Sequence, residues 1–99
     1  MRKRRVFFAP EARDNLVELY EWIAAAADPD IALPYIERIE DYRLTLETAS
    51  ERGQLREDIR PGLRVASFRR RLTTALSVSG DRATILRVFN GGRNLEREI

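Results

Sequence analysis

The chain has 99 residues, enough for one domain with a single modest hydrophobic core, so we expect one domain over residues 1–99. It contains neither cysteine nor histidine. These absences exclude disulfides, thiolate or imidazole metal sites and a histidine-based catalytic triad, and we expect no metal and no cofactor. No apolar stretch is long enough for a signal peptide or for the roughly 18 residues of a membrane span, which predicts a soluble cytoplasmic protein.

The formal net charge of +2 is unevenly distributed. Residues 1–50 carry seven basic and ten acidic side chains, whereas residues 51–99 carry eleven basic and six acidic ones. Within residues 60–93 the ratio is eight to one, and all eight basic residues are arginines. Arginine offers a planar fork of donors to phosphate or carboxylate, so we expect this half to meet an anionic surface. A GC-rich coding background would explain the lack of lysine equally well, but not the lack of acids in residues 61–80.

The first predicted elements are a short strand and an amphipathic helix. The strand covers residues 6–8 and ends at Ala9-Pro10, where proline suits the first position of a helix. The helix is expected over about residues 10–27, because its apolar residues recur three or four positions apart. They are Ala12, Leu16, Leu19, Ile23 and Ala27.

A second helix is expected after Asp28-Pro29-Asp30, running to about residue 52 before Gly53. Its N-cap is either Asp28 or Asp30. With Asp28 as the cap, Pro34 lies inside the helix and should distort it, whereas with Asp30 as the cap Pro34 lies at the edge of the first turn. The predicted apolar stripe consists of Ile31, Tyr35, Ile39, Tyr42, Leu46 and Ala49.

Beyond residue 58 the apolar period changes from that of a helix to that of a strand. Strands are predicted over residues 63–68, 70–78 and 83–90, with a hairpin turn at residues 79–82. In the last strand we expect Thr84, Leu86 and Val88 on one face and Ile85, Arg87 and Phe89 on the other. The order is β-α-α-β-β-β, an α+β fold in which an N-terminal strand, an antiparallel α-hairpin and a three-stranded antiparallel meander place both helices on one sheet face.

Five stretches occur in a characteristic order along the chain: residues 8–12 (FAPEA), 19–23 (LYEWI), 60–64 (RPGLR), 67–71 (SFRRR) and 84–95 (TILRVFNGGRNL). Together they resemble the RelE/ParE toxins of bacterial type II toxin–antitoxin systems, and the resemblance covers nearly the whole chain. It implies a cytoplasmic toxin that a tightly bound antitoxin neutralises. In this superfamily RelE-type members cleave mRNA on the ribosome, whereas ParE-type members poison DNA gyrase.

The residues favour the ParE-like branch. RNA cleavage needs a proton shuttle with a pKa near neutrality, yet histidine is absent and the three tyrosines, at positions 20, 35 and 42, lie on the predicted helices. Glu57 or Asp58 could act as a base, but an arginine gives up a proton reluctantly and no matching acid is present. We therefore expect a gyrase inhibitor with a ParD-like antitoxin and no small-molecule substrate, rather than an enzyme. The alternatives are a RelE-like ribosome-dependent mRNA endonuclease and a non-toxic basic nucleic-acid-binding module.

Four arginines are predicted to bind the target. Strand alternation places Arg69 and Arg71 on the sheet face opposite the helices, and Arg87 joins them if Leu86 and Val88 point toward the helices. The fourth, Arg93, follows Gly91-Gly92 in the tail that the resemblance links to the target. Pairing of each arginine with helix carboxylates is the alternative.

Four apolar residues are predicted to bind the antitoxin. Trp22 lies at the margin of the first helical stripe, where it could anchor a partner or pack on the edge of its own core. Phe68 and Phe89 are placed on the arginine-bearing side of the sheet. Leu95 gives the tail a group with which to dock.

Overall fold

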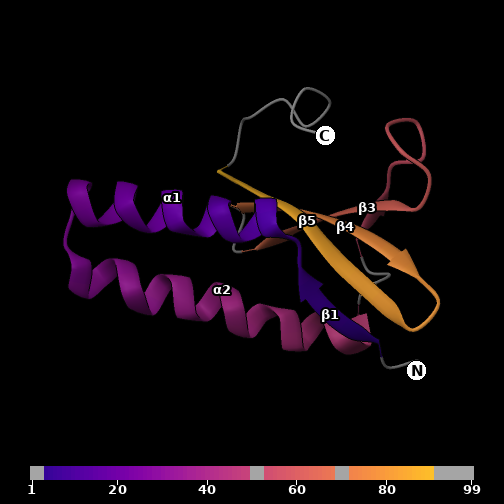
Figure 1. Cartoon of the computed structure of the whole chain (residues 1–99), viewed down its shortest axis with the longest axis horizontal. Coiled ribbons are helices and arrows are strands. Elements are labelled where there is room, and N and C mark those ends of the chain that lie inside the picture. Colours follow the sequence, from indigo (N-terminus) through magenta and orange to yellow (C-terminus); the bar gives the residue numbers. More distant parts are fainter. Residues whose placement is uncertain (1–3, 50–52, 69–71, 91–99) are drawn as a thin grey trace.

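The computed structural model describes residues 4–49, 53–68 and 72–90. Its elements are β1 (Arg5–Phe8), α1 (Pro10–Ala26), α2 (Pro29–Ala49), β2 (Gln54–Leu55), β3 (Leu63–Phe68), β4 (Leu72–Ser79) and β5 (Arg82–Asn90). This order confirms the predicted α+β fold and adds the two-residue strand β2 before the meander (Figure 1).

The strands form one five-stranded sheet in the order β1-β5-β4-β3-β2. β3, β4 and β5 are the predicted antiparallel meander, and β2 extends it by pairing antiparallel with β3. β1 pairs parallel with β5, with Phe8 opposite Ile85, so the sheet is mixed rather than wholly antiparallel. The parallel register has a direct consequence for the helices, because α1 begins where β1 ends and therefore begins beside the middle of β5.

A β-bulge interrupts the ladder between β4 and β5. Ala75 pairs with Arg87 and Leu76 pairs with Ile85, so Leu86 is an extra residue on β5. The predicted faces of β5 were therefore wrong before the bulge: Ile85 belongs to the helix-facing core, and Leu86 packs on the opposite face. Beyond the bulge the predicted alternation holds, with Val88 toward the helices.

The two helices cover one face of the sheet, over β1 and β5 (Figure 1). The main core lies between these layers and consists of Val6, Ala12, Leu16, Ile36, Ile39, Leu46, Leu72, Leu76, Ala83, Ile85 and Val88. A smaller cluster lies on the other face, where Ile59 and Leu86 pack against the buried residues Leu63, Ala75 and Phe89. The β2–β3 loop, which carries Ile59, thus covers part of the face that the helices leave open.

The turn between the helices settles the position of the cap. The Asp28 side-chain Oδ1 accepts a hydrogen bond from the Asp30 N–H at 2.7 Å, and the Asp28 carbonyl accepts from the N–H groups of Ile31 and Ala32 at 3.0 Å each. Asp28 is therefore the N-cap. Pro34 consequently lies inside α2, where it cannot donate a hydrogen bond to the preceding turn.

The buried stripe of α2 is rotated from the predicted one. Its buried members are Ala32, Ile36, Ile39 and Leu46, with Tyr35 and Tyr42 partly buried against the core. Ile31 was predicted to be in the stripe but is 59% exposed. The small side chain of Ala32 faces inward in its place, because the first turn of α2 lies beyond the sheet and has only α1 to pack against (Figure 1). None of the helices within the described ranges is long and apolar enough to cross a membrane.

Candidate functional site

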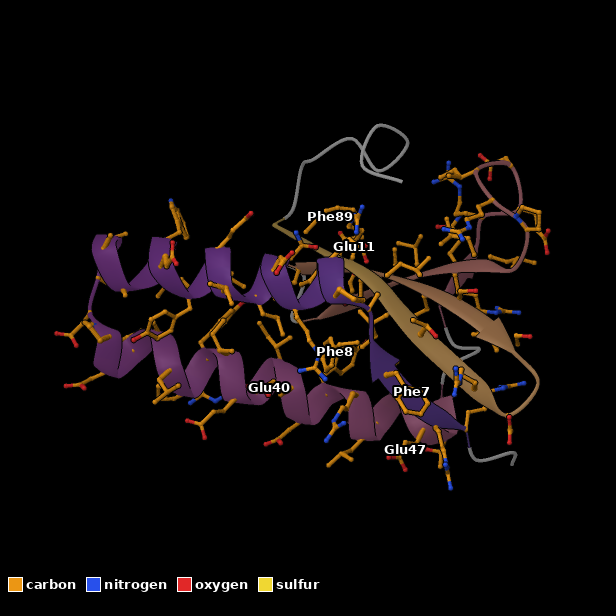
Figure 2. All side chains as sticks on the ribbon, viewed as in Figure 1. Phe7, Phe8, Glu11, Glu40, Glu47 and Phe89 are labelled. Carbon is orange, nitrogen blue, oxygen red and sulfur yellow. The ribbon has the colours of Figure 1, made fainter. Side chains whose placement is uncertain are left out.

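A polar hollow of about 240 Å³ lies where the start of α1, strand β5 and the β2–β3 loop meet. Its lining comprises Glu11 from α1, Arg60 from the loop, and Leu86 and Arg87 from β5. Figure 2 shows Glu11 at the N-terminal end of α1, next to the end of β5 that carries Phe89. Two guanidinium groups and one carboxylate around an apolar side chain give the hollow a formal charge of +1.

Arg87 contacts both Leu86 and Glu11, two residues that line the hollow with it. Its Nη1 donates a hydrogen bond to the Leu86 carbonyl at 3.3 Å and lies 3.8 Å from Oε2 of Glu11. The side chains of Arg87 and Glu11 are 29% and 57% exposed, respectively. An ion pair that is long and open to solvent contributes little to stability. An incoming anion can therefore take over Arg87 from Glu11 at small cost.

The position of Glu11 follows from how α1 is fixed to β5. The Ala9 N–H donates to the Ile85 carbonyl at 2.8 Å, which continues the β1–β5 ladder to the start of the helix. Further along α1, Oδ1 of Asn15 accepts a hydrogen bond from the backbone N–H of Val88 at 3.0 Å. These two contacts hold the first turn of α1, and with it Glu11, beside the bulged part of β5.

Arg60 reaches the hollow from a loop with defined internal bonds. The Arg60 N–H donates to the Arg56 carbonyl at 3.3 Å, and the Leu63 N–H donates to the Arg60 carbonyl at 3.1 Å. Gly62 adopts φ +73°, a conformation that residues with a Cβ adopt only at a cost, and turns the chain into β3. The loop is thus a compact structure that presents one guanidinium to the hollow.

The two acids that the sequence suggested as bases, Glu57 and Asp58, are exposed in this loop. Nε and Nη2 of Arg56 donate to the two carboxylate oxygens of Asp58 at 3.0 and 2.9 Å. This bidentate bond lowers the pKa of the Asp58 carboxyl below its ordinary value. A carboxylate whose pKa is lowered is a weaker base, so Asp58 is poorly suited to accept a proton from a hydroxyl group.

Of the four arginines predicted to bind the target, only Arg87 lies within the described ranges. The prediction that Arg87 occupies the face opposite the helices agrees with its pairing with Ala75, a member of the smaller cluster. Arg69, Arg71 and Arg93 lie outside the residues that the structure describes.

The antitoxin-binding candidates fall into three groups. Trp22 is 61% exposed, so most of its ring is available to a partner, whether or not its remaining surface packs on the edge of its own core. Phe89 is on the predicted face but is only 2% exposed, which makes its ring a core residue of this structure rather than a surface anchor. The Phe68 backbone pairs with Leu72, but the Phe68 side chain and all of Leu95 lie outside what the structure describes.

Sequence reasoning missed two features of this face. It did not connect Glu11 with Arg87, because 76 positions separate them and only the parallel β1–β5 pairing brings them together. It also did not single out Phe7, which is exposed and lies 4.6 Å from the Arg82 guanidinium, measured to the ring centroid. Figure 2 shows Phe7 and Phe8 on opposite sides of β1.

Comparisons with known proteins agree with this architecture. Residues 6–95 match the family described as the ParE toxin of type II toxin-antitoxin system, parDE. A solved structure titled "Chromosomal ParDE TA system from P. aeruginosa" superimposes with a TM-score of 0.76 at 21% sequence identity, covering 89% of this chain and 96% of that chain. No curated protein sequence matches this chain.

Proposed function

Because the chain belongs to the ParE toxin family of type II toxin–antitoxin systems, we propose that it inhibits DNA gyrase and is neutralised by a ParD-like antitoxin in the bacterial cytoplasm. The observation that carries this proposal is the hollow formed by Glu11, Arg60, Leu86 and Arg87. It combines two guanidinium groups that bind an anion with a single carboxylate, and these four residues do not supply the pair of an acid and a base that RNA cleavage requires.

The chemistry of the hollow favours binding over catalysis. Cleavage of RNA requires a base that accepts the 2′-hydroxyl proton and an acid that protonates the leaving oxygen. Guanidinium groups stabilise negative charge but do not deliver protons at neutral pH. We therefore propose that the protein acts by occupying a surface of its target, with Arg60 and Arg87 contacting acidic side chains or DNA phosphates.

Antitoxin binding is supported by a different part of the chain. Trp22 is a large aromatic side chain that its own fold leaves exposed, and such residues are over-represented among the anchors of protein interfaces. We propose that the antitoxin covers at least part of the surface that the toxin uses on gyrase, since this is the simplest way for binding to neutralise activity.

The test is a supercoiling and DNA-cleavage assay with purified gyrase and purified toxin. The wild type should inhibit supercoiling or accumulate cleaved DNA, and a stoichiometric amount of the antitoxin should restore activity. Arg87→Gln should weaken inhibition by about tenfold or more, since a hydrogen bond to a charged group contributes roughly 1.5–3 kcal/mol. Arg82→Gln, which removes the same charge from the same strand outside the hollow, is the matched control.

The assay also separates the alternatives. Ribosome-dependent mRNA cleavage with unaffected gyrase would refute the proposal in favour of the endonuclease. Strong, salt-dependent binding to naked nucleic acid without inhibition of gyrase or of growth would refute it in favour of a nucleic-acid-binding module.

A further inference from the structure

The far end of the helical hairpin lies beyond the sheet. In Figure 1, α1 and α2 run side by side past the edge of the strands, and the turn that joins them is the most distant part of the described chain from β3. We call residues 14–37 the hairpin end. Because no strand lies beneath its outer part, the hairpin end has surface on several sides that its own fold does not use.

The hairpin end carries charges of one sign. It contains six acidic residues, Asp14, Glu18, Glu21, Asp28, Asp30 and Glu37, and no arginine or lysine. All six are exposed, and no ion pair joins any of them to another residue that the structure describes. The nearest basic residues on the two helices, Arg13 and Arg38, adjoin the ends of the segment, so its own side chains carry only negative charge, whereas the hollow at the other end of α1 contains two arginines.

Large apolar side chains are concentrated on the same segment. Of the seven large hydrophobic residues that are exposed within the described ranges, four belong to the hairpin end: Val17, Trp22, Ile31 and Leu33. Trp22 and Ile31 are the most exposed, at 61% and 59%. Single exposed apolar side chains are normal on a monomer, but apolar side chains gathered on one surface mark an interface, so the positions of Trp22 and Ile31 on the hairpin are decisive.

Trp22 and Ile31 lie on the same side of the hairpin. Trp22 immediately precedes Ile23, which is half-buried in the apolar stripe of α1, and Ile31 immediately precedes the buried Ala32. Each is thus rotated by about 100° in the same sense from the inward direction of its helix. Beyond the sheet, the inward direction of each helix points at the other helix. In an antiparallel pair, the same rotation from these two facing directions leads to the same side, so both side chains contribute to one surface.

Acidic side chains extend this surface along α1. Asp14, Glu18 and Trp22 are spaced four residues apart and therefore form one row on the helix. The row places two carboxylates in line with the aromatic ring, with Ile31 across the hairpin turn. A partner that covers this side meets an apolar centre and a negative margin, the arrangement of an interface hot spot with a charged rim.

We propose that this side of the hairpin end docks onto a positively charged protein surface of DNA gyrase, with Trp22 and Ile31 as apolar anchors and Asp14 and Glu18 as the complementary charges. This inference rests on the proposed function, which supplies the target. Charge complementarity selects the occupant, because an enzyme that binds DNA presents basic surfaces. Nucleic acid and anionic lipid have the same sign as the hairpin end and are repelled by it.

The two ends of the toxin then have complementary roles. The arginines of the hollow suit an anionic group, and the hairpin end suits a cationic one. At the boundary between a basic protein surface and the DNA that it binds, both kinds of partner are present together. A molecule with opposite charges at its two ends can engage both.

The test measures binding of full-length toxin variants to purified gyrase by surface plasmon resonance at two salt concentrations. Trp22→Ala should raise the Kd by at least about tenfold through a faster off-rate. Asp14→Asn/Glu18→Gln should lower the on-rate and reduce its dependence on salt. The matched controls are Leu44→Ala and Glu40→Gln/Asp41→Asn, which make equivalent changes at exposed positions of α2 outside the hairpin end and should leave binding unchanged.

The outcomes distinguish this inference from the function on which it rests. If the wild type neither binds nor inhibits gyrase, the proposed function fails. If the wild type does both and the hairpin-end variants match it, only the docking surface is refuted. Loss of antitoxin binding without loss of gyrase binding would refute it too, and would assign the surface to the antitoxin. Because Trp22 is exposed, unchanged thermal unfolding of Trp22→Ala should confirm that any loss of binding is local.

Discussion

Asn15 is the residue whose replacement tests most directly how the site is built. Strand β1 pairs with β5 only over the first part of β5, from Arg82 to Ile85. Beyond that point the N–H of Val88 depends on the side chain of Asn15, whose Oδ1 accepts it at 3.0 Å. Asn15→Ala removes this acceptor and leaves a partly buried N–H without a partner.

The expected cost follows from the burial of that group. Leaving a buried donor unsatisfied costs about 1–3 kcal/mol, and the partial burial of this bond favours the lower half of the range. For a domain of this size, each kcal/mol corresponds to roughly 4–8 °C in Tm. Asn15→Asp retains an oxygen at the same position and should keep most of the stability, whereas Asn15→Ala should lose it.

Thermal unfolding followed by circular dichroism measures both variants against the wild type. Amide hydrogen exchange at Val88 gives a local readout, since its protection should fall in Asn15→Ala and persist in Asn15→Asp. A Tm of Asn15→Ala equal to that of the wild type would refute the reasoning. Equal losses in the two variants would show that the amide group, rather than the acceptor oxygen, is what matters.

Three further predictions concern the core, the sheet edge and the β2–β3 loop. Leu76→Ala, at a fully buried position of β4, should lower the free energy of unfolding by about 2–5 kcal/mol in a urea titration, and a loss below about 1 kcal/mol would contradict its central place in the core. Gly53→Ala should destabilise the chain, because an added Cβ would lie 2.7 Å from the Val65 carbonyl oxygen; an unchanged urea midpoint would show that the backbone yields there. The pKa of Asp58, measured by NMR, should lie below its ordinary 3.8 and return toward that value in Arg56→Ala. Because the folded-state pKa is the lower one, the stabilisation is present above the unfolded-state pKa and is lost as the pH falls through the folded-state pKa. Identical titration curves of Asp58 in the two proteins would refute the bidentate bond.

The sequence predicted the elements because their signals are local. Pro10 marked the start of α1, and the apolar period identified the helices and the strands of the meander. The choice between Asp28 and Asp30 as the cap stayed open, because both are good capping residues and only the observed hydrogen bonds distinguish them. The inversion of the first half of β5 by the bulge was not predicted. The extra residue shifts the alternation at the adjacent apolar residues Ile85 and Leu86, but a regular strand also places such a pair on opposite faces, so the pair alone does not reveal a bulge.

The candidate site was less predictable than the fold. Arg87 was singled out from strand alternation, and its face is as expected even though the reasoning assumed a regular strand. Its partner Glu11 could not be identified, because the contact requires the parallel pairing of β1 with β5. The prediction for Ile31 was wrong because a helical wheel shows only which side chains share a face, not where the sheet beneath that face ends.

The pairing of β1 with β5 also affects how the chain acquires its structure. This ladder joins residues 77 positions apart, Arg5 and Arg82, whereas the contacts of the meander and of the helical hairpin are mostly local. Contacts between distant parts of a chain are slow to form, because the long loop between them must first close at a cost in conformational entropy. The hollow combines Glu11, which follows β1 in the chain, with Leu86 and Arg87 of β5. A nascent or partly unfolded chain in which β1 and β5 are not paired therefore lacks the hollow. We expect the capacity to bind a target to arise with the final closure of the sheet, and not before.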